Sequence, residues 1–358
     1  MTLRWRSRLL PLTCLVAVVA IVAASAPRLP GAEPHTSGDP ALARIVELHR
    51  PAGTNRIATA VVGPDGSTFA GFGADPADEF EIGSISKVLN GMLLADAVDR
   101  EEVTLDTPVG DLLDVKGSPV PEVTLRELAT HTSGLPRLPA DLGFTLRAIL
   151  TNYTAGNPYT DSPAVLLERA RNAGVDPAGT FEYSNFGAAL LGQALAAQAG
   201  LSYPELLRER ITDPLGMKDT YVPAEPEELR PQAVQGYATT GKAAQPWTMG
   251  GMAPAGGVRS TSADLALLAG ALLDGTAPGS RSLDPVDSAE DTPMGLAWFI
   301  GTPSDPEADA YRWHNGQTGG FAGMLILDLD SDRASIVLSN MSGPVDELGA
   351  ALMTGGAQ

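Results

Sequence analysis

The sequence predicts a protein of the α/β class, of the α+β type, in which one antiparallel sheet is built from both ends of the chain, flanked by helices, with a mainly helical region inserted between them. Three observations predict this fold. Two strand-like runs joined by a turn lie near the start, helices and loops fill residues 88 to about 275, and strand-like runs return near the end. Strands at both ends with helices between them favour a single sheet formed by the two termini. The 358 residues, 44% of them hydrophobic, are enough for a substantial core.

Residues 1–26 have the pattern of a secretory signal. Three arginines in the first eight positions precede an apolar run from Leu9 to Ala24, and small residues follow. We expect export to a secreted or extracytoplasmic location, with the segment either cleaved or retained as a membrane anchor, although the run is shorter than the roughly 20 residues that span a bilayer comfortably. Residues 27–39, rich in Pro and Gly, predict a linker, which leaves residues 40–358 as the folded domain.

The first elements of that domain follow from spacing and turn chemistry. Residues 41–49 have helical spacing of apolar side chains. The runs Ile57 to Val62 and Thr68 to Phe72 are separated by Pro64-Asp65-Gly66, a turn sequence, so they predict a hairpin.

A helix is predicted to begin at Ser84, because apolar residues recur at spacings of three and four from Ile85 to Leu94 and form one buried stripe. Further helices and strands are predicted by the same patterns. The helices are residues 186–199, 265–273 and 345–353, and the strands are residues 295–300, 320–327 and 334–339.

Composition excludes several classes of function. The formal charge is −19 and becomes −22 without the three N-terminal arginines, which disfavours nucleic acid and anionic membrane surfaces as partners. The only cysteine, Cys14, lies in the signal segment, so the exported domain has neither disulfides nor a thiol nucleophile. The four histidines are scattered without metal-ligand spacing, and no glycine-rich stretch has a nucleotide-binding pattern, so we expect no metal and no cofactor.

The strongest chemical signal is Ser84-Ile85-Ser86-Lys87. A spacing of three places the hydroxyl and the amine on one face of a helix, within hydrogen-bond reach, which is the geometry of an activated nucleophile. The helix N-terminus also favours a developing oxyanion. The alternative is a capping serine followed by a solvated lysine.

Two further stretches support the catalytic interpretation. In Tyr183-Ser184-Asn185 a phenol and a carboxamide lie two residues apart and can project to the same side. In His314-Asn315-Gly316-Gln317 a histidine stands just before a glycine, whose missing side chain lets a substrate backbone approach closely. Taken alone, Tyr183 could be an ordinary half-buried tyrosine and His314 a structural strand histidine.

Taken together, the three stretches resemble, in order and separation, the three motifs of the penicillin-recognising serine hydrolases, on the branch of class C β-lactamases and related DD-peptidases. Residues 131–136, 213–217 and 256–261 also resemble that branch, and the similarity covers roughly residues 40 to 353. The resemblance implies a β-lactamase/transpeptidase-like fold with the active site between the sheet and the helical region.

The resemblance also implies roles for individual residues. Ser84 attacks a carbonyl to form an acyl-enzyme, Lys87 and Tyr183 transfer the proton to the leaving group, and water releases the acyl group. Asn185 orients the substrate amide, and the backbone N–H groups of Ser84 and Gln317 hold the oxyanion. The sequence leaves open whether Lys87 or Tyr183 is the base.

The third motif departs from the family. Class C β-lactamases usually carry Lys-Thr-Gly there and the related DD-peptidases often His-Thr-Gly, whereas this chain has His314-Asn315-Gly316. A neutral histidine anchors a carboxylate more weakly than lysine does, and asparagine lacks the threonine hydroxyl, so peptidase or esterase action is favoured over efficient β-lactam turnover. If a protonated His314 binds the carboxylate, activity on carboxylate-bearing peptides should fall as pH rises through its pKa. His131 is assigned a structural role.

The leading hypothesis is therefore an exported, DD-peptidase-like serine hydrolase acting on D-amino-acid cell-wall peptides. An esterase or a β-lactamase with the same machinery is the alternative, and a penicillin-binding sensor is a weaker one. The expected partner is a small-molecule or peptide acyl substrate, with no nucleic acid, a membrane tether through the N-terminal segment as an option, and the oligomeric state left open.

Overall fold

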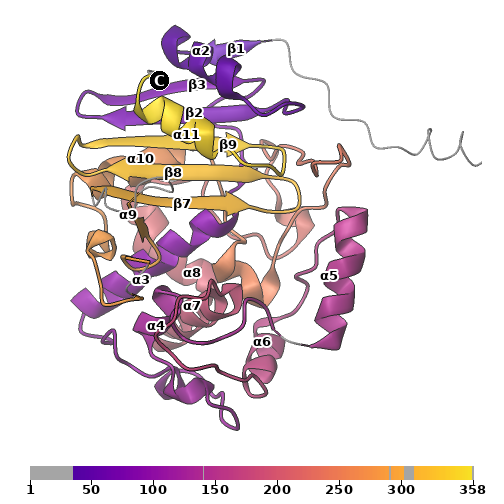
Figure 1. The fold of residues 1–358 in the computed structure, drawn as a ribbon, viewed down its shortest axis with the longest axis vertical. Helices are drawn as coiled ribbons and strands as arrows, with labels where there is room; N and C mark the ends of the chain where they lie inside the picture. Colours follow the sequence, from indigo (N-terminus) through magenta and orange to yellow (C-terminus); the bar gives the residue numbers. More distant parts are fainter. Residues whose placement is uncertain (1–34, 140, 290–291, 302–309, 357–358) are drawn as a thin grey trace, which may run out of the picture.

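Both ends of the chain contribute to one antiparallel sheet, as the sequence predicts (Figure 1). The computed structural model describes residues 35–139, 141–289, 292–301 and 310–356, so the predicted signal segment and most of the linker lie outside the described residues. The seven strands stand in the order β1-β3-β2-β9-β8-β7-β6. They are β1 (Thr36–Gly38), β2 (Ile57–Gly63), β3 (Gly66–Phe72), β6 (Phe299–Ile300), β7 (Tyr311–Gln317), β8 (Ala322–Asp328) and β9 (Arg333–Ser339).

The predicted hairpin is present, and its partner strand comes from the other end of the chain. Gly63 pairs with Gly66, so β2 and β3 are joined by the two-residue turn Pro64-Asp65. On its other edge β2 pairs with β9, with Ile57 opposite Ser339. Residues 36–38, in the expected linker, form the short edge strand β1 against β3.

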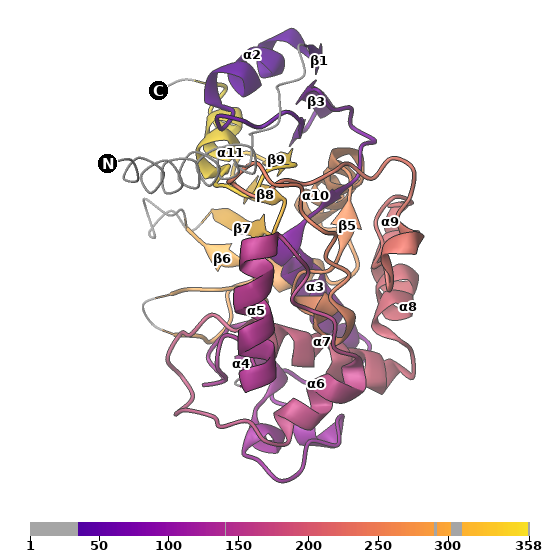
Figure 2. The same ribbon diagram turned by 90° about the vertical axis from the view of Figure 1, so that its right-hand side faces the viewer.

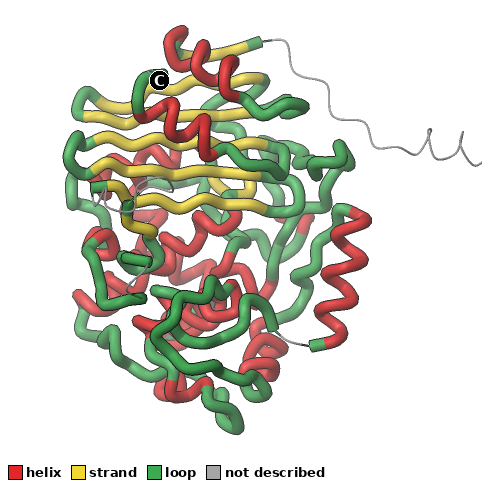
Figure 3. Tube along the Cα trace, viewed as in Figure 1, coloured by secondary structure: helices red, strands yellow, loops and turns green. Residues whose placement is uncertain are grey.

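Helices cover both faces of the sheet (Figures 1 and 3). The apolar face formed by Ile57, Met324 and Val337 packs against α2 and α11, whereas α10 and α3 lie against the opposite face. Figure 2 shows the sheet and its covering helices at one end of the molecule and the remaining helices at the other. The helices are α2 (Pro40–His49), α3 (Ser86–Asp99), α4 (Leu125–Ala129), α5 (Leu142–Thr154), α6 (Pro163–Ala170), α7 (Asn185–Ala199), α8 (Tyr203–Leu207), α9 (Asp213–Leu215), α10 (Ser262–Leu273) and α11 (Asp346–Met353).

Helix α3 is buried on all sides, so the prediction of a single buried stripe is wrong. Every residue from Ser86 to Ala97 is buried, including Lys87, Asn90 and Asp96. The three-and-four spacing identified the helix but not its surroundings, because α3 runs between the sheet and the helical region and its small and polar residues pack as well. A buried central helix holds its first turn in a fixed position.

The predicted strand at residues 295–300 is shorter than expected. Ala297 has a left-handed backbone with φ of 63°, which a strand cannot accommodate, and only Phe299 and Ile300 pair with β7 as β6. Beyond Trp313, β7 therefore has no neighbour on that side in the sheet, and this free edge faces the start of α3.

A second, two-stranded sheet lies beneath the junction of the two regions. It pairs β4 (Phe80–Glu81) with β5 (Arg259–Ser260). Within it the buried Arg259 guanidinium pairs with Glu79 and, at 3.1 Å, with Glu81. Since breaking a buried pair leaves an uncompensated charge, this cluster fixes the segment just before Ser84 to β5.

Over the described ranges, none of the helices combines the length and the apolar character needed to cross a bilayer.

Candidate active site

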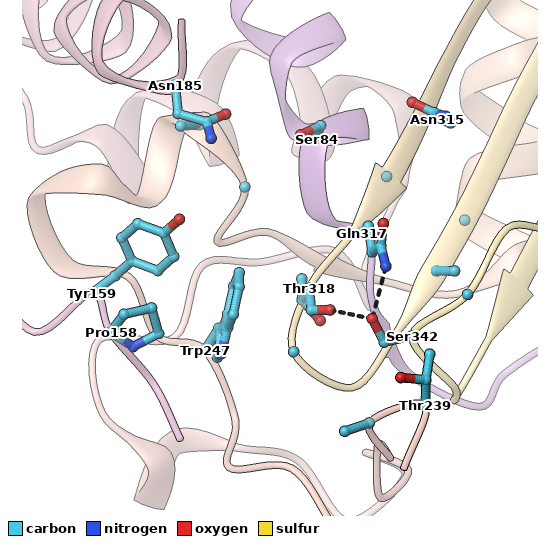
Figure 4. A pocket seen from close by; sticks show the side chains of 18 of the residues that line it. Ser84, Pro158, Tyr159, Asn185, Thr239, Trp247, Asn315, Gln317, Thr318 and Ser342 are labelled. Atoms are coloured by element: carbon cyan, nitrogen blue, oxygen red, sulfur yellow. Dashed lines mark hydrogen bonds between the residues drawn. The ribbon is translucent and has the colours of Figure 1, made fainter. Parts of the chain in front are cut away.

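Ser84 lies in a short 3₁₀ turn, η1 (Gly83–Ile85), that leads directly into α3. The α-helix itself begins two residues later than predicted, at Ser86. The three-residue spacing nevertheless brings Lys87 Nζ to 3.0 Å from Ser84 Oγ, as the activated-nucleophile interpretation requires. The Ser84 side chain is partly exposed and lines a pocket (Figure 4). Lys87 is buried and does not line that pocket.

The Lys87 amine is held by two groups that can only accept hydrogen bonds from it. Its Nζ lies 2.6 Å from the carbonyl oxygen of Ala255 and 2.8 Å from Oδ1 of Asn185. Burial, reinforced by the positive charge of Arg137, holds the pKa of Lys87 well below its ordinary value. No carboxylate of the described residues pairs with this amine to oppose that effect. The site therefore favours a neutral Lys87.

Tyr183 stays protonated in the same environment. Burial raises the pKa of Tyr183 to about 12, against the opposing effects of the Ser84 hydroxyl and Arg137. Lys87 Nζ lies 4.9 Å from the centre of the Tyr183 ring. The environment thus favours the neutral amine of Lys87 and the protonated phenol of Tyr183, which can act as one base and one acid.

Asn185 is the first residue of α7, and its orientation follows from its contact with Lys87. Because Oδ1 accepts from the amine, Nδ2 is the group left to donate into the pocket. The hydroxyl of Ser184 caps the helix by accepting from Gly187 N at 2.9 Å. The predicted triad of Ser84, Lys87 and Tyr183 and the neighbouring Asn185 are thereby brought together.

Two glycines allow η1 and the free edge of β7 to approach closely. A Cβ on Gly83, whose φ is +52°, would stand 2.6 Å from the backbone nitrogen of Gln317. A Cβ on Gly316 would stand 2.0 Å from the carbonyl oxygen of Ile82 and 3.2 Å from the backbone nitrogen of Ser84. The backbone nitrogens of Ser84 and Gln317 therefore lie where both can serve one oxyanion.

The polar side chains of β7 are not arranged as expected if a protonated His314 were to bind a substrate carboxylate. His314 is fully buried, is absent from the pocket lining, and its Nδ1 lies 2.6 Å from the carbonyl oxygen of Asn315. Burial is the main cause that lowers the pKa of His314 to about 3. Asn315 is exposed in the pocket but donates to Asp346 at 3.1 Å. A role of His314 in substrate binding stays a prediction, and a protonated His314 is not what this environment favours.

The buried His314 should make the protein less stable in acid. The folded state keeps His314 neutral down to about pH 3, whereas the unfolded chain binds a proton near pH 6.5, so this contribution is present above about pH 6.5 and is lost as pH falls. The loss is at most about 1.4 kcal/mol per pH unit. Urea unfolding between pH 6.5 and 4 should show a shallower pH dependence for His314→Gln than for wild type, while the exposed His35→Gln should match wild type. Equal slopes for wild type and His314→Gln would show that His314 is not held neutral.

The pocket has a volume of about 970 Å³, large enough for a peptide fragment or a drug-sized molecule. Tyr159 and Trp247, whose ring centres lie 5.0 Å apart, form one side of it (Figure 4). Phe299 and Trp313 also line it, with their stacked ring centres 4.7 Å apart. At its strand end Gln317 Nε2 donates to Ser342 Oγ at 2.9 Å, and Ser342 donates to the carbonyl of Thr318 at 2.9 Å (Figure 4).

Sequence reasoning did not find several pocket residues. Ala255 contributes only a carbonyl oxygen, which any residue could supply, although it directly precedes the Gly256-Gly257 stretch of the resemblance. Trp247 and Arg137 are isolated in sequence and carry no pattern of their own. The nearest signal for Arg137 is its place directly after the stretch at residues 131–136.

His131 supports the site from behind. It is buried with φ of 57°, and its Nδ1 accepts from the backbone N–H of Ser184 at 3.2 Å. Its ring lies 4.4 Å from that of Tyr183. These contacts fit the structural role predicted for it. Across the described ranges, no group of three or more His, Cys, Asp or Glu side chains gathers to hold a metal ion.

The fold and the site define a serine hydrolase. Its sheet is built from both termini, its serine lies at the start of a buried helix, and a lysine and a tyrosine lie beside that serine. A family model described as Beta-lactamase matches residues 49–354. The chain therefore belongs to the beta-lactamase family, as its motifs indicated.

Curated relatives share parts of the chain. The D-alanyl-D-alanine-carboxypeptidase/endopeptidase AmpH of Escherichia coli (strain K12) is 33% identical over 154 residues, which cover 42% of this chain and 38% of AmpH. Penicillin-binding protein 4 of Amycolatopsis lactamdurans is 31% identical over 224 residues, which cover 59% of this chain and 55% of that protein. The chain thus spans only part of the length of these relatives.

The fold matches a solved structure over nearly its whole length. The crystal structure of a class C beta-lactamase from Rhodobacter sphaeroides matches with a TM-score of 0.70 and 23% identity, covering 87% of this chain and 96% of that one. The α/β fold class and the mixed arrangement predicted from sequence are confirmed.

Proposed function

We propose that this protein is an exported serine hydrolase that works through an acyl-enzyme on Ser84, with Lys87 as the base. The observation that carries the proposal is the environment of the amine. A neutral amine has two N–H groups and one lone pair, and the two carbonyl oxygens at 2.6 and 2.8 Å take both N–H groups. That leaves the lone pair of a neutral Lys87 for the Ser84 hydroxyl, whose Oγ lies 3.0 Å from Nζ and which can donate its proton to the amine.

The mechanism follows from these roles. Lys87 takes the proton of Ser84 as Oγ attacks the substrate carbonyl carbon, and the negative charge on the carbonyl oxygen is held by the N–H groups of Ser84 and Gln317. The Tyr183 phenol gives its proton to the leaving group and regains one from the Lys87 ammonium, which restores both groups. A water molecule then attacks the acyl-enzyme and gives a proton to Lys87, which passes it to Ser84 Oγ as the bond from Oγ to the acyl carbon breaks and the acid is released.

The first candidate substrate is a D-amino-acid peptide of the cell wall. The partial similarity to AmpH, whose name describes a D-alanyl-D-alanine carboxypeptidase, supports it. Export is supported by the three arginines and the apolar run before residue 26, and an extracytoplasmic location suits such a substrate.

The second candidate is an ester or amide without a carboxylate on its leaving group. It is favoured by β7, where His314 is buried with a lowered pKa and Asn315 is engaged with Asp346. Neither side chain therefore offers a cation to a leaving-group carboxylate. A β-lactam is disfavoured on the same ground.

Covalent labelling tests the proposal. Purified protein should form an adduct with a fluorescent penicillin or turn over members of a panel of D-Ala-D-Ala peptides, p-nitrophenyl esters and nitrocefin, and Ser84→Ala should abolish both labelling and turnover. The variant should fold, because a small residue at this position costs about 1 kcal/mol or less. Mass spectrometry that locates the wild-type adduct on another residue would refute the nucleophile assignment. The relative rates across the panel decide between peptide and ester.

A further inference from the structure

We propose that Arg137 binds an anionic group on the acyl part of the substrate. Arg137 is exposed and lines the pocket beside Asn185, which lies across the pocket from Asn315 of β7 (Figure 4). The inference rests on the proposed function, because it names the substrate class that the Ser84 site would accept.

The guanidinium of Arg137 is placed in the pocket without a carboxylate partner among the described residues. This is unusual for its neighbourhood, where Arg147 and Arg169 both pair with Asp161. The chain carries 43 acidic and only 24 basic residues. An arginine without an acidic partner at the active site is therefore unexpected. An unpaired cation in a pocket is available to a ligand.

The geometry of the guanidinium leaves its donors free. Arg137 lies over the Tyr183 ring, with its central carbon 5.2 Å from the ring centre. A cation–π contact of this kind uses none of the lone pairs of a carboxylate, and the N–H groups of a guanidinium match the two oxygens of a carboxylate.

The backbone of Arg137 is fixed to the element that carries Asn185. Its carbonyl oxygen accepts from the backbone N–H of Asn185 at 3.0 Å, and the carbonyl of Pro136 accepts from Ser184 Oγ at 2.8 Å. Asn185 is the residue whose free Nδ2 is proposed to hold the substrate amide. Arg137 therefore lies on the acyl side of Ser84, and a carboxylate near that amide would be within its reach.

The opposite wall carries the opposite charge. Asp346 lines the pocket next to Asn315, so an anionic group directed toward β7 would face a carboxylate. An anion is thus favoured at Arg137 and disfavoured at the strand. The two walls together select the orientation of a substrate that carries a single carboxylate.

A pair of esters of equal length tests the inference. Mono-4-nitrophenyl glutarate carries a carboxylate at the end of its acyl chain, where 4-nitrophenyl valerate carries a methyl group. The ratio of kcat/KM for the glutarate to that for the valerate should fall at least about tenfold in Arg137→Gln. It should fall less in Arg137→Lys, because lysine keeps the positive charge but lacks the paired N–H donors of the guanidinium. The ratio is the readout because Arg137 also lowers the pKa of Lys87, and that effect applies to both esters.

Lys242→Gln is the matched control, since Lys242 lines the same pocket and its loss removes the same charge. Its ratio should change less than twofold. An unchanged ratio in Arg137→Gln, or an equal fall in Lys242→Gln, would overturn the inference. The inference would also be overturned if Arg137→Gln lowered kcat/KM only for 3-carboxy-4-nitrophenyl valerate, whose carboxylate is on the leaving group. If ester hydrolysis does not depend on Ser84 at all, the proposed function fails and this inference fails with it, whereas Ser84-dependent hydrolysis with an unchanged ratio removes only the role of Arg137.

Discussion

Lys87→Met should slow acylation of Ser84 by at least about a hundredfold, equivalent to about 2.7 kcal/mol in the activation free energy. Methionine keeps most of the volume of the buried side chain but has no lone pair to accept the Ser84 proton. Tyr183→Phe should cost at least about as much, because the leaving group then lacks its proton donor. The two residues form one proton-transfer unit, so the double variant should be far from additive.

These effects can be measured as the pre-steady-state release of nitroaniline from an activated amide, because an amine leaving group needs a proton whereas nitrophenolate does not. Lys242→Met and Tyr153→Phe are matched controls, because both side chains line the pocket and neither is in the proton-transfer unit. A single variant of Lys87 or Tyr183 that acylates near the wild-type rate would remove that residue from the mechanism.

The pH dependence separates the two candidate bases. If neutral Lys87 is the base, acylation should be lost as pH falls through the lowered pKa of Lys87 and should stay level above it. If Tyr183 were the base, its pKa of about 12 would make the rate rise steadily with pH far above neutrality. The burial of both groups favours Lys87 over Tyr183 as the base, and the pH profile tests that choice.

The catalytic group could be predicted from sequence because its members are close in the chain or occur in recognisable stretches. A serine and a lysine three residues apart are neighbours in either an α-helix or a 3₁₀ turn, so the late start of α3 did not matter. The sheet was predicted for a similar reason, since the Pro64-Asp65 turn and the alternating runs near the end are local signals.

The electrostatic features could not be predicted in this way. The protonation states of Lys87 and His314 depend on complete burial between the sheet and the helical region, which periodicity does not report. The Ala255 carbonyl that holds the amine comes from a segment 168 residues away along the chain, and Asp346 reaches Asn315 across 31 residues. Such long-range contacts decide what β7 can bind, and they are set only by the fold.

Gly316→Ala should reduce acylation by about two to three orders of magnitude while leaving most of the fold intact. The new Cβ would stand 2.0 Å from the carbonyl oxygen of Ile82, a backbone atom that cannot turn away, so β7 and η1 must separate. That separation moves the Gln317 N–H away from the Ser84 N–H, and loss of one oxyanion donor costs about 10²–10³ in kcat.

Gly343→Ala is the matched control, because Gly343 lines the same pocket and a Cβ there meets no atom within 4 Å. Thermal unfolding of both variants shows whether the loss is local, since overpacking alone should cost about 1–3 kcal/mol of stability. Gly83→Ala approaches the same contact from the other side, with its Cβ 2.6 Å from the Gln317 nitrogen, and should lose acylation in the same way. Near wild-type acylation by folded Gly316→Ala and Gly83→Ala would mean that the backbone of β7 does not stabilise the oxyanion, and the donor opposite Ser84 would have to come from another element of the pocket.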